Sequence, residues 1–563
     1  MQTKPLRSAT EARRPDRWTC YRGSMAKRKP VRLAAPSPPP ASRTFPEWLL
    51  PAAPAALAVA AYANSLANGF VSDDKIQLLK NPLVTSVAQI PQILGSGVWS
   101  ILHIPGSPGN YYRPMQFLVY LALYEVAGFR APAFHLFMML LHALNAVLLY
   151  LLVRRLASTR AAVAAAALFA VHPVHTEVVD WVASVPDLMV TTLAVFGVWR
   201  LARRDEPLRV PQIAGHCVLY LAALLTKETG VMLLPLYAGF GWLYRGRGWG
   251  ELRRNAVLYG AMAATFVIYL AMRSAALGSL APGQEAFFHL TPLEFALSAV
   301  AVAGDYLGAL VWPVNLSYFH MFHPATGVTA AVVLPAMALI AIAAVLVRWR
   351  KPLPAYGAFW IAVTLAPAFN LTGVGQNVFA ERYLYLPSAG FCWIAAWAWE
   401  RMAERRPRWA LASGAAVLVA CFAVTVARNS DWRDDYTLFR VTLQQAPESG
   451  WLHNWMAGVY VERREFARAL SEEKLAVQYE PRAPAFHENL GNILLVSDPR
   501  AAVAEFQKLI ELQPDRAENH SDLGLALEAT GRAGEAAPEY EKALRLDPND
   551  REAQDGARRV AGR

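Results

Sequence analysis

Long apolar segments recur along this chain and constrain its fold more than any other feature of the sequence. A helix needs about 20 apolar residues to cross a bilayer. Hydrophobic residues make up 55% of the 563 residues and charged residues only 17%, which excludes an ordinary soluble protein. Two stretches, 114–129 and 293–313, either cross or lie along the interface. Eleven further segments are predicted to span, at residues 47–64, 132–153, 160–178, 186–202, 213–226, 229–244, 255–273, 329–347, 353–370, 383–400 and 409–427.

The net charge of +11 is concentrated in the N-terminal tail. Residues 1–43 hold eleven Lys and Arg against Glu11 and Asp16, so this tail alone carries +9. A basic run before an apolar segment predicts a cytoplasmic anchor, because Lys and Arg resist translocation. It does not indicate a nucleic-acid site. The tail is rich in proline and has no apolar period, so residues 1–44 are predicted to be disordered and residues 45–428 to form the membrane domain.

Basic residues follow every second predicted span. These clusters are Arg154, Arg155 and Arg160; Arg200, Arg203, Arg204 and Arg209; Arg245, Arg247, Arg253 and Arg254; Arg348, Arg350 and Lys351; and Arg401, Arg405, Arg406 and Arg408. Cytoplasmic loops carry the excess of Lys and Arg, so the N-terminus is predicted inside and everything after about residue 428 outside. The two ambiguous stretches should then both cross or both not cross. The Ala- and Arg-rich composition favours a bacterial inner membrane, but an endoplasmic-reticulum lumen has the same topology.

The last part of the chain repeats with a short period. The repeating positions are Pro447, Pro481, Pro514 and Pro548, spaced by 34, 33 and 34 residues, and Gly458, Gly491 and Gly524, spaced by 33. This period is typical of tetratricopeptide repeats, in which small residues let two helices approach closely. Residues 436–563 are therefore predicted to be an α-solenoid of half a repeat, at 436–447, and three full repeats. Such arrays bind extended peptides or other proteins, and nothing in this region resembles a catalytic constellation.

Four groups of polar residues fall on the predicted outer side, and the first is the pair Asp73 and Asp74. Two neighbouring carboxylates repel, so one pKa rises and that group becomes a better proton acceptor near neutral pH. Adjacent side chains point to different faces, so one carboxylate is expected to contact an acceptor and the other to orient a partner or a metal. The alternative is a solvated cap of a helix that starts at Lys75.

The second group closes the third predicted span and contains His172, His175 and Glu177, with Asp180 and Asp187 nearby. This spacing permits a metal site, but zinc would usually need a third protein ligand, so no metal is assigned. Interfacial histidines and a capping Glu are the alternative. The four cysteines show no paired spacing and indicate neither a disulfide framework nor a zinc site.

The third group is Lys227 and Glu228, the only charges between residues 217 and 244. An ionisable residue at membrane depth is costly and is a functional candidate for that reason. Lys227 is suited to hold an anionic phosphate at the bilayer surface. The alternative is that the two charges mark a loop between two short spans.

The fourth group opens the tenth predicted span and contains Glu381 and Arg382. Arg382 offers a planar fork for phosphate, and Arg113 is a similar external arginine. The neighbouring Tyr383 and Tyr385 could be residues of an interfacial aromatic belt.

Together these motifs form an ordered series that is more specific than any one of them. In chain order they are Ser72-Asp73-Asp74-Lys75, Asn81-Pro82, Tyr112-Arg113-Pro114, His135 with His142, the hexapeptide His172–Glu177, Thr226-Lys227-Glu228, Pro313-Val314-Asn315-Leu316-Ser317 and Glu381–Pro387, followed by the repeats. From about residue 47 to its end the chain resembles the transmembrane and tetratricopeptide-repeat O-mannosyltransferases and their bacterial relatives.

The resemblance implies a GT-C glycosyltransferase fold. Such an enzyme would move a sugar, expected to be mannose, from a polyprenyl-phosphate donor to Ser or Thr hydroxyls of a protein outside the cytoplasm, with inversion. By this resemblance Asp73 or Asp74 is the base, and Lys227, Arg382 and Arg113 stabilise the leaving phosphate. The residues expected to support them are His172, His175, Glu177, Glu228 and Glu381. No cofactor is required, although a divalent metal could assist. The expected partners are the donor lipid, membrane lipids and a protein acceptor recruited by the repeats.

A competing hypothesis is a catalytically silent membrane scaffold whose repeats recruit partners and whose charges only fix topology. A transporter is a third class, but no pair of interrupted spans at corresponding positions suggests one. The first two hypotheses differ in one observable. In an enzyme the Asp73/Asp74 pair, Lys227 and Arg382 converge on one external cavity, whereas scattered positions favour the scaffold.

Overall fold

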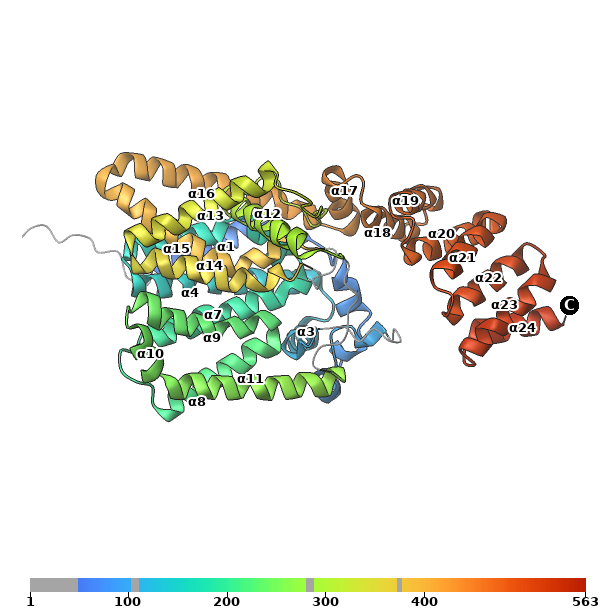
Figure 1. Cartoon of the computed structure of the whole chain (residues 1–563), viewed down its shortest axis with the longest axis horizontal. Coiled ribbons are helices and arrows are strands. Elements are labelled where there is room, and N and C mark those ends of the chain that lie inside the picture. The colour runs from blue at the N-terminus through green and yellow to red at the C-terminus, as the bar shows by residue number, and fades with distance from the viewer. Residues whose placement is uncertain (1–48, 103–110, 280–287, 372–376, 563) are drawn as a thin grey trace, which may run out of the picture. The chain divides into compact units, whose positions relative to one another are not determined.

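The computed structural model describes residues 49–102, 111–279, 288–371 and 377–562, so the predicted disordered tail and Cys20 lie outside the described residues. Every regular element within these ranges is a helix, which confirms the all-α prediction. The helices of the membrane domain are α1 (Leu49–Tyr62), α2 (Ile90–Leu94), α3 (Pro114–Ala127), α4 (Ala131–Leu156), α5 (Thr159–Val171), α6 (Thr176–Asp180), α7 (Val185–Ala202), α8 (Val210–Thr226), α9 (Leu233–Gly239), α10 (Gly248–Arg254), α11 (Ala256–Leu277), α12 (Pro292–Val311), α13 (Ala330–Trp349), α14 (Pro352–Leu365), α15 (Tyr385–Arg405) and α16 (Pro407–Asn429) (Figure 1).

Several of these helices are long and apolar enough to cross a membrane, which confirms a multi-pass membrane protein. Within the described ranges eight helical stretches meet this test, and the α5–α6 pair, bent by 52°, would be a ninth. Three of the eleven predicted spans do not meet the test, and one of them is 383–400, whose helix α15 is not among the eight stretches. Residues 213–226 belong to α8, which has only 17 residues, and residues 229–244 are divided among three short elements. Of the two ambiguous stretches, 293–313 meets the test as α12, while α3 has 14 residues and is shorter than a span. This contradicts the prediction that both stretches cross or neither does.

Burial separates the inner helices of the membrane domain from the outer ones. In α4 and in the stretch that contains α7, 61% of the apolar window is buried, whereas the values are 6% for α13 and 11% for the stretch that contains α16. Apart from Arg348 in its last turn, the exposed side chains of α13 are apolar, including Leu334 and Ile340, as a helix in contact with lipid requires. On α5 the buried residues are mostly alanines, such as Ala162 and Ala166, which let neighbouring helices approach closely.

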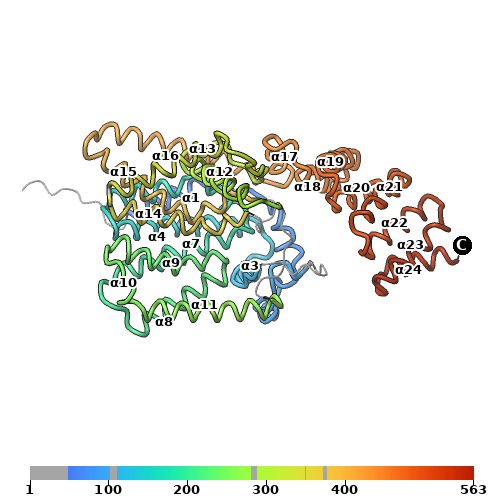
Figure 2. The backbone as a smooth tube through the Cα atoms, in the orientation of Figure 1, coloured from blue at the N-terminus to red at the C-terminus, as the bar shows by residue number. Residues whose placement is uncertain are grey.

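The two ends of the membrane helices differ in their residues. Figures 1 and 2 show these helices side by side, with α10 and the turn between α15 and α16 at one end and α3 at the other. The end with α10 carries predicted basic clusters, such as Arg253 and Arg254. The other end carries Arg113, which caps α3, and the short helix η2 (Lys75–Leu79) that follows Asp73 and Asp74.

The C-terminal helices form the predicted repeats. They are α17 (Asp435–Gln445), α18 (Gly450–Glu462), α19 (Phe466–Tyr479), α20 (Pro484–Ser497), α21 (Pro499–Leu512), α22 (Ala517–Ala529), α23 (Ala533–Leu546) and α24 (Arg551–Ala561). A Cβ atom on Gly491 would lie 2.6 Å from the Phe506 ring, so a larger residue would push α20 and α21 apart. Gly458 is different, because a Cβ there would meet nothing within 4 Å. This glycine therefore borders open space instead of a helix contact.

The first repeat helices pack against external segments of the membrane domain. One buried cluster joins Val71 and Trp181 with Phe439 of α17 and Leu452 of α18. The connection from α16 to α17 is short and passes through η12 (Ser430–Trp432), whose Trp432 is fully buried in the same cluster. Burial of this much apolar surface holds the first repeat against the loop that contains Asp73.

Candidate active site

The turn that presents Asp73 is held from the repeat side. Ser72 has φ +53°, an uncommon value for a residue other than glycine. Its N–H donates to Asp435 Oδ1 at 2.7 Å, and its hydroxyl is 2.6 Å from the Tyr318 hydroxyl. Lys75 Nζ lies 2.7 Å from both Asp435 and Glu462. The turn is thereby anchored to the first residue of α17 and the last residue of α18.

Asp74 is enclosed by backbone amides. Its Oδ1 accepts the N–H of Ala183 at 2.6 Å and its Oδ2 accepts the N–H of Val71 at 3.1 Å. The side chain is fully buried, and burial raises its pKa well above the ordinary value while the amides oppose the rise. Both oxygens are therefore committed to holding the loop against the segment before α7.

Asp73 accepts no comparable backbone hydrogen bonds from the described residues. Its closest polar contact is Gln77 Nε2, at 3.5 Å from Oδ2. Burial raises the pKa of Asp73 to about 6, and the positive charge of Arg382 opposes this rise. The cause is thus burial, whereas the sequence predicted repulsion between the two carboxylates. A carboxylate with this pKa is ionised at neutral pH and can still accept a proton readily.

Asp73 lines a cavity of about 380 Å³, which is within the range of small-molecule sites. The other charged residues of its wall are Arg113, Asp187, Lys227, Glu228, Arg273 and Arg382, and its aromatic residues are Trp99, Tyr111, Trp181 and Tyr383. The cavity brings together Asp73 and all three predicted phosphate-binding cations. This convergence is the observable that separates the enzyme hypothesis from the scaffold hypothesis.

Two of the cations are held by carboxylates of the same wall. Lys227 ends α8, and its Nζ lies 2.6 Å from Asp187 Oδ1 in the first turn of α7. Arg113 donates from Nε and Nη2 to Glu228 Oε2, at 3.0 and 2.8 Å. Arg273 Nη1 lies 3.9 Å from the other oxygen of Glu228. These pairs fix the cations in place before any ligand arrives, which lowers the cost of reorganisation.

Arg382 is positioned by Glu177. It lies in η11 (Glu381–Leu384), and its Nη1 is 2.5 Å from Glu177 Oε1, while its N–H donates to Oε2 at 2.8 Å. The guanidinium also lies over the Trp181 and Tyr383 rings, at 5.4 and 4.9 Å from their centroids. Glu177 is fully buried and does not line the cavity, so its geometry is that of a positioning residue for Arg382.

The two histidines of the second group lie in helix packing. His172 Nε2 is 2.9 Å from the carbonyl oxygen of Leu310, and His175 Nε2 is 2.7 Å from Ser388 Oγ. Neither histidine lines the cavity. No set of three His, Cys, Asp or Glu side chains within the described ranges is arranged to hold a metal ion.

Glu381 likewise lies behind the cavity wall. Its Oε2 accepts from Arg428 Nη2 at 2.7 Å, and its Oε1 accepts the N–H of Ser317 and lies 3.2 Å from His320 Nε2. Glu381 therefore ties the end of α16 to the segment after α12. Glu381 helps to position the neighbouring Arg382 by fixing the backbone of η11, and it does not line the cavity itself.

A second cavity, of about 530 Å³, runs from Asp73 along the first repeats. We call it the repeat groove; its residues from the repeats are Asp435, Phe439, Asn454, Trp455, Ala457, Gly458, Val459, Val461, Glu462, Phe466, Glu473, Asn489, Asn492, Ile493 and Val496. Glu473 is fully buried, its Oε1 accepts from Asn454 Nδ2 at 2.8 Å, and its Oε2 has no partner among the described residues. Burial raises the pKa of Glu473 to about 7. Asp73 is the residue that lines both cavities.

Some wall residues were not predicted from the sequence. Arg273 is the only charge in α11, so the rule that singled out Lys227 would also have found it. Asp187 was noted only as a neighbour of the histidine motif, and its contact with Lys227 requires α7 and α8 to meet. Trp181 and Tyr111 carried no sequence signal that separates them from the other aromatic residues.

Two family models match the chain. Residues 112–273 match the model described as dolichyl-phosphate-mannose-protein mannosyltransferase, and residues 517–550 match a tetratricopeptide repeat. The first match contains Arg113, Lys227 and Arg273, while Asp73 and Arg382 lie outside it. The second confirms the repeats predicted from the 33- and 34-residue period.

Several proteins are similar to this chain over its membrane domain and repeats. The protein O-mannosyl-transferase TMTC3 of Mus musculus is 24% identical, with 88% of this chain and 60% of that protein covered. Its namesake from Homo sapiens is 25% identical, with 77% and 51% covered. The protein O-mannosyl-transferase Tmtc2 of Drosophila melanogaster is 34% identical over 193 residues, which are 33% of this chain and 20% of that protein.

The chain therefore spans about half to three fifths of the length of the first two relatives. The matches confirm the resemblance carried by the ordered motifs: this chain is similar to the transmembrane and tetratricopeptide-repeat O-mannosyltransferases.

Proposed function

We propose that this chain transfers mannose from a polyprenyl-phosphate donor to a Ser or Thr hydroxyl of a protein. The observation that carries the proposal is the place of Asp73 between the charged cavity and the repeat groove. A donor phosphate in the cavity and an acceptor chain in the groove would meet at this carboxylate. The names of the relatives and the matched mannosyltransferase model support the choice of sugar and acceptor.

The charges of the cavity suit a phosphodiester. Four cations and three carboxylates line it, which leaves one positive charge in excess when all are ionised. A sugar joined to a polyprenyl phosphate carries one negative charge at its phosphodiester. Transfer releases a phosphate monoester, which carries up to two negative charges, while proton uptake by Asp73 leaves two positive charges in excess. The excess positive charge of the wall thus equals the negative charge of the ligand before and after the reaction. The wall therefore stabilises the negative charge that develops on the phosphate.

The reaction needs one base and one stabilised leaving group. The acceptor oxygen attacks the anomeric carbon, the bond from that carbon to the phosphate oxygen breaks, and its electron pair remains on the phosphate. The hydroxyl proton passes to Asp73. Arg382, Arg113 and Lys227 stabilise the leaving phosphate, and Glu177, Glu228 and Asp187 hold these cations in position.

The repeat groove suits an extended acceptor segment. Asn489 and Asn492 are three residues apart on α20 and exposed, so their amides can both donate to and accept from a peptide backbone. The free oxygen of Glu473 offers one further buried partner. Phe466 and Val496, 53% and 86% exposed, provide apolar contacts beside these groups. We assign acceptor recruitment to this surface.

We propose that the cavity and the repeats lie on the non-cytoplasmic side. The support is the distribution of charge, since basic clusters such as Arg253 and Arg254 occupy the opposite end of the membrane helices from α3 (Figure 1). In a bacterial inner membrane this side would be the periplasm.

The test is sugar transfer by the full chain in proteoliposomes that contain polyprenyl-phosphate mannose, with a Ser/Thr-rich protein as acceptor. Asp73→Asn should lower the rate by roughly 10² to 10⁴. Glu125→Gln, on an exposed carboxylate of α3, serves as the matched control and should keep the wild-type rate. Equal transfer by wild type and Asp73→Asn would overturn the assignment of Asp73, and no transfer by the wild type from this donor would overturn the function.

A further inference from the structure

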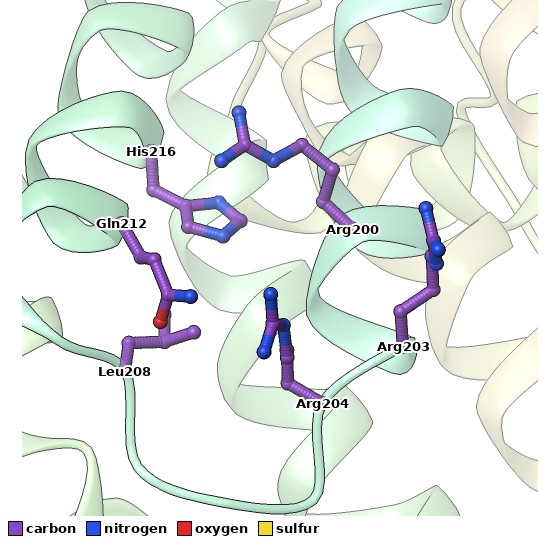
Figure 3. A pocket seen from close by; sticks show the side chains of 6 residues that line it. All are labelled: Arg200, Arg203, Arg204, Leu208, Gln212 and His216. Carbon is purple, nitrogen blue, oxygen red and sulfur yellow. The ribbon is translucent and has the colours of Figure 1, made fainter.

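A third cavity, of about 380 Å³, lies where α7 ends and α8 begins (Figure 3). We call it the arginine pocket; its residues are Arg200, Arg203, Arg204, Leu208, Gln212 and His216. Figure 3 shows that Arg200, Arg204, Gln212 and His216 direct their polar ends into the same space, with Arg203 at its edge. These residues lie in the loop predicted to be cytoplasmic and in the helix ends that flank it, at the opposite end of α7 from the wall residue Asp187.

No carboxylate lines the arginine pocket. Arg200, Arg203 and Arg204 make no ion pair with any described residue, and the ring contacts of the first two are with aromatic residues of α7. The loop does contain an acid, but Asp205 lies 3.7 Å from Arg155 and 3.7 Å from Arg245. The pocket therefore concentrates positive charge without an internal counter-charge.

Membrane topology explains why arginines occur in this loop but not why they converge. The next basic loop is a direct contrast, because Arg245 and Arg247 there both pair with Glu251, at 2.9 and 3.2 Å. Glu251 is 2% exposed, so a buried carboxylate compensates part of the positive charge of that second loop. The arginine pocket has the same residue type without the neutralising carboxylate, as an anion-binding site would require.

The remaining polar groups of the pocket also suit an anion. Gln212 Oε1 accepts the N–H of Arg209 at 3.0 Å, and Figure 3 shows its nitrogen on the side of the pocket. His216 is 1% exposed, and its Nδ1 is 2.8 Å from the Tyr237 hydroxyl, which leaves Nε2 without a hydrogen bond to any described residue. Its ring points into the pocket in Figure 3. A buried histidine, a glutamine amide and the guanidinium groups of Arg200 and Arg204 thus face one space as donors, with Arg203 at its edge.

We propose that the arginine pocket binds a phosphate group. Guanidinium forks match phosphate oxygens in pairs, and a pocket of this size holds one headgroup or one small phosphate compound. Val210 and Val218 lie on α8, the helix that also carries Gln212 and His216, and are 78% and 70% exposed, so they are available to the chains of a bound phospholipid. The ligand chemistry is the phosphate, from a phospholipid headgroup or from a soluble phosphate.

The test compares the full chain with Arg200→Gln/Arg204→Gln and with Arg405→Gln/Arg408→Gln, which removes two exposed arginines from another basic loop. Binding is measured by native mass spectrometry with phosphatidylglycerol, with phosphatidylcholine and with inorganic phosphate. The pocket variant should bind the anionic ligand roughly tenfold more weakly, and the control variant should match wild type. If the natural ligand is a phospholipid, the wild-type chain should retain phosphatidylglycerol. If it is a soluble phosphate compound, the wild-type chain should bind inorganic phosphate and neither lipid.

Equal binding by wild type and the pocket variant would overturn the proposal, as would an equal loss in the control. If Arg200→Gln/Arg204→Gln does not fold, the single variant Arg204→Glu replaces it in the test, because Arg204 is exposed. Loss of the bound phosphate is expected in that variant as well, and retention would contradict the pocket.

Discussion

The charged cavity and the repeat groove meet at Asp73 but are built from different groups. In the cavity each predicted cation is held by a carboxylate, as in the pairs Lys227 with Asp187 and Arg113 with Glu228. In the groove the polar groups are amides and one buried acid, Glu473, with a free oxygen. Fixed charges suit a reaction in which charge develops, whereas amides and exposed apolar side chains suit recognition of an extended chain. Changes in the cavity should therefore lower kcat, and changes in the groove should raise KM.

Arg382→Gln should have the largest effect among changes that leave Asp73 in place. It removes the cation beside the leaving phosphate and leaves Glu177 buried without its partner. We expect kcat to fall by roughly 10² to 10³, as for loss of one preorganised donor. Steady-state transfer with the protein acceptor measures this, and a rise in KM at constant kcat would contradict the separation of the two cavities.

Asp74→Asn should affect stability more than the reaction. The side-chain oxygen of an Asn can accept a hydrogen bond from one of the two backbone N–H groups that donate to Asp74. Its NH₂ group would then face the other N–H, which would lose its acceptor. We expect a loss of about 1 to 3 kcal/mol, measured as a lower Tm or denaturation midpoint in detergent. Asp73→Asn is the matched control, because it removes a buried charge with few contacts. A similar loss in both variants would contradict the division of roles between the two neighbours.

Asn489→Ala/Asn492→Ala should act on the groove alone. Loss of two backbone-directed amides is expected to raise KM for a protein acceptor by about 3- to 10-fold, with kcat unchanged. Gln478→Ala on α19, an exposed residue outside the groove, is the control. If transfer to a protein acceptor is unchanged in the double variant, the groove is not the acceptor surface.

The smallest expected effect is on the pH profile. A base with a pKa of about 6 must be ionised to act, so the rate should rise with pH and level off above that value. Arg382 lowers this pKa, so in Arg382→Gln the acidic limb should move to higher pH. The pH dependence of kcat/KM is measured for the wild type and for Arg382→Gln. If the acidic limb lies at the same pH in both, a group other than Asp73 titrates.

Local properties of the sequence predicted much of the fold. Helices could be predicted where the signal lies within the segment itself. Examples are the apolar segments at 132–153 and 186–202 and the 33- and 34-residue period of the repeats, because both signals depend on residues close in sequence. The interval 229–244 was harder. Its composition resembles a span, but residues 227–230 end α8 and begin η8 (Glu228–Met232), so the chain forms short elements there.

The sequence also predicted several residues of the cavity wall. Lys227 was singled out because a charge within an apolar segment is costly, and Arg113 because it is an external arginine similar to Arg382. The supporting role of Glu177 was expected from the resemblance, but its contact with Arg382 joins residues 205 positions apart. His172 and His175 have the residue types of a metal site, and only packing shows that Leu310 and Ser388 occupy their Nε2 atoms.

Residue type and periodicity predicted most of the membrane helices and the repeats, and the resemblance to a known family paired the acidic motif with distant cations. They could not separate Asp73 from Asp74, since the two are identical and adjacent. The tertiary structure distinguishes them through the N–H group of Ala183, 109 residues away, which donates to Asp74 Oδ1 at 2.6 Å. Asp74 accepts that hydrogen bond. Asp73 lines both cavities, because the side chains of adjacent residues point in different directions.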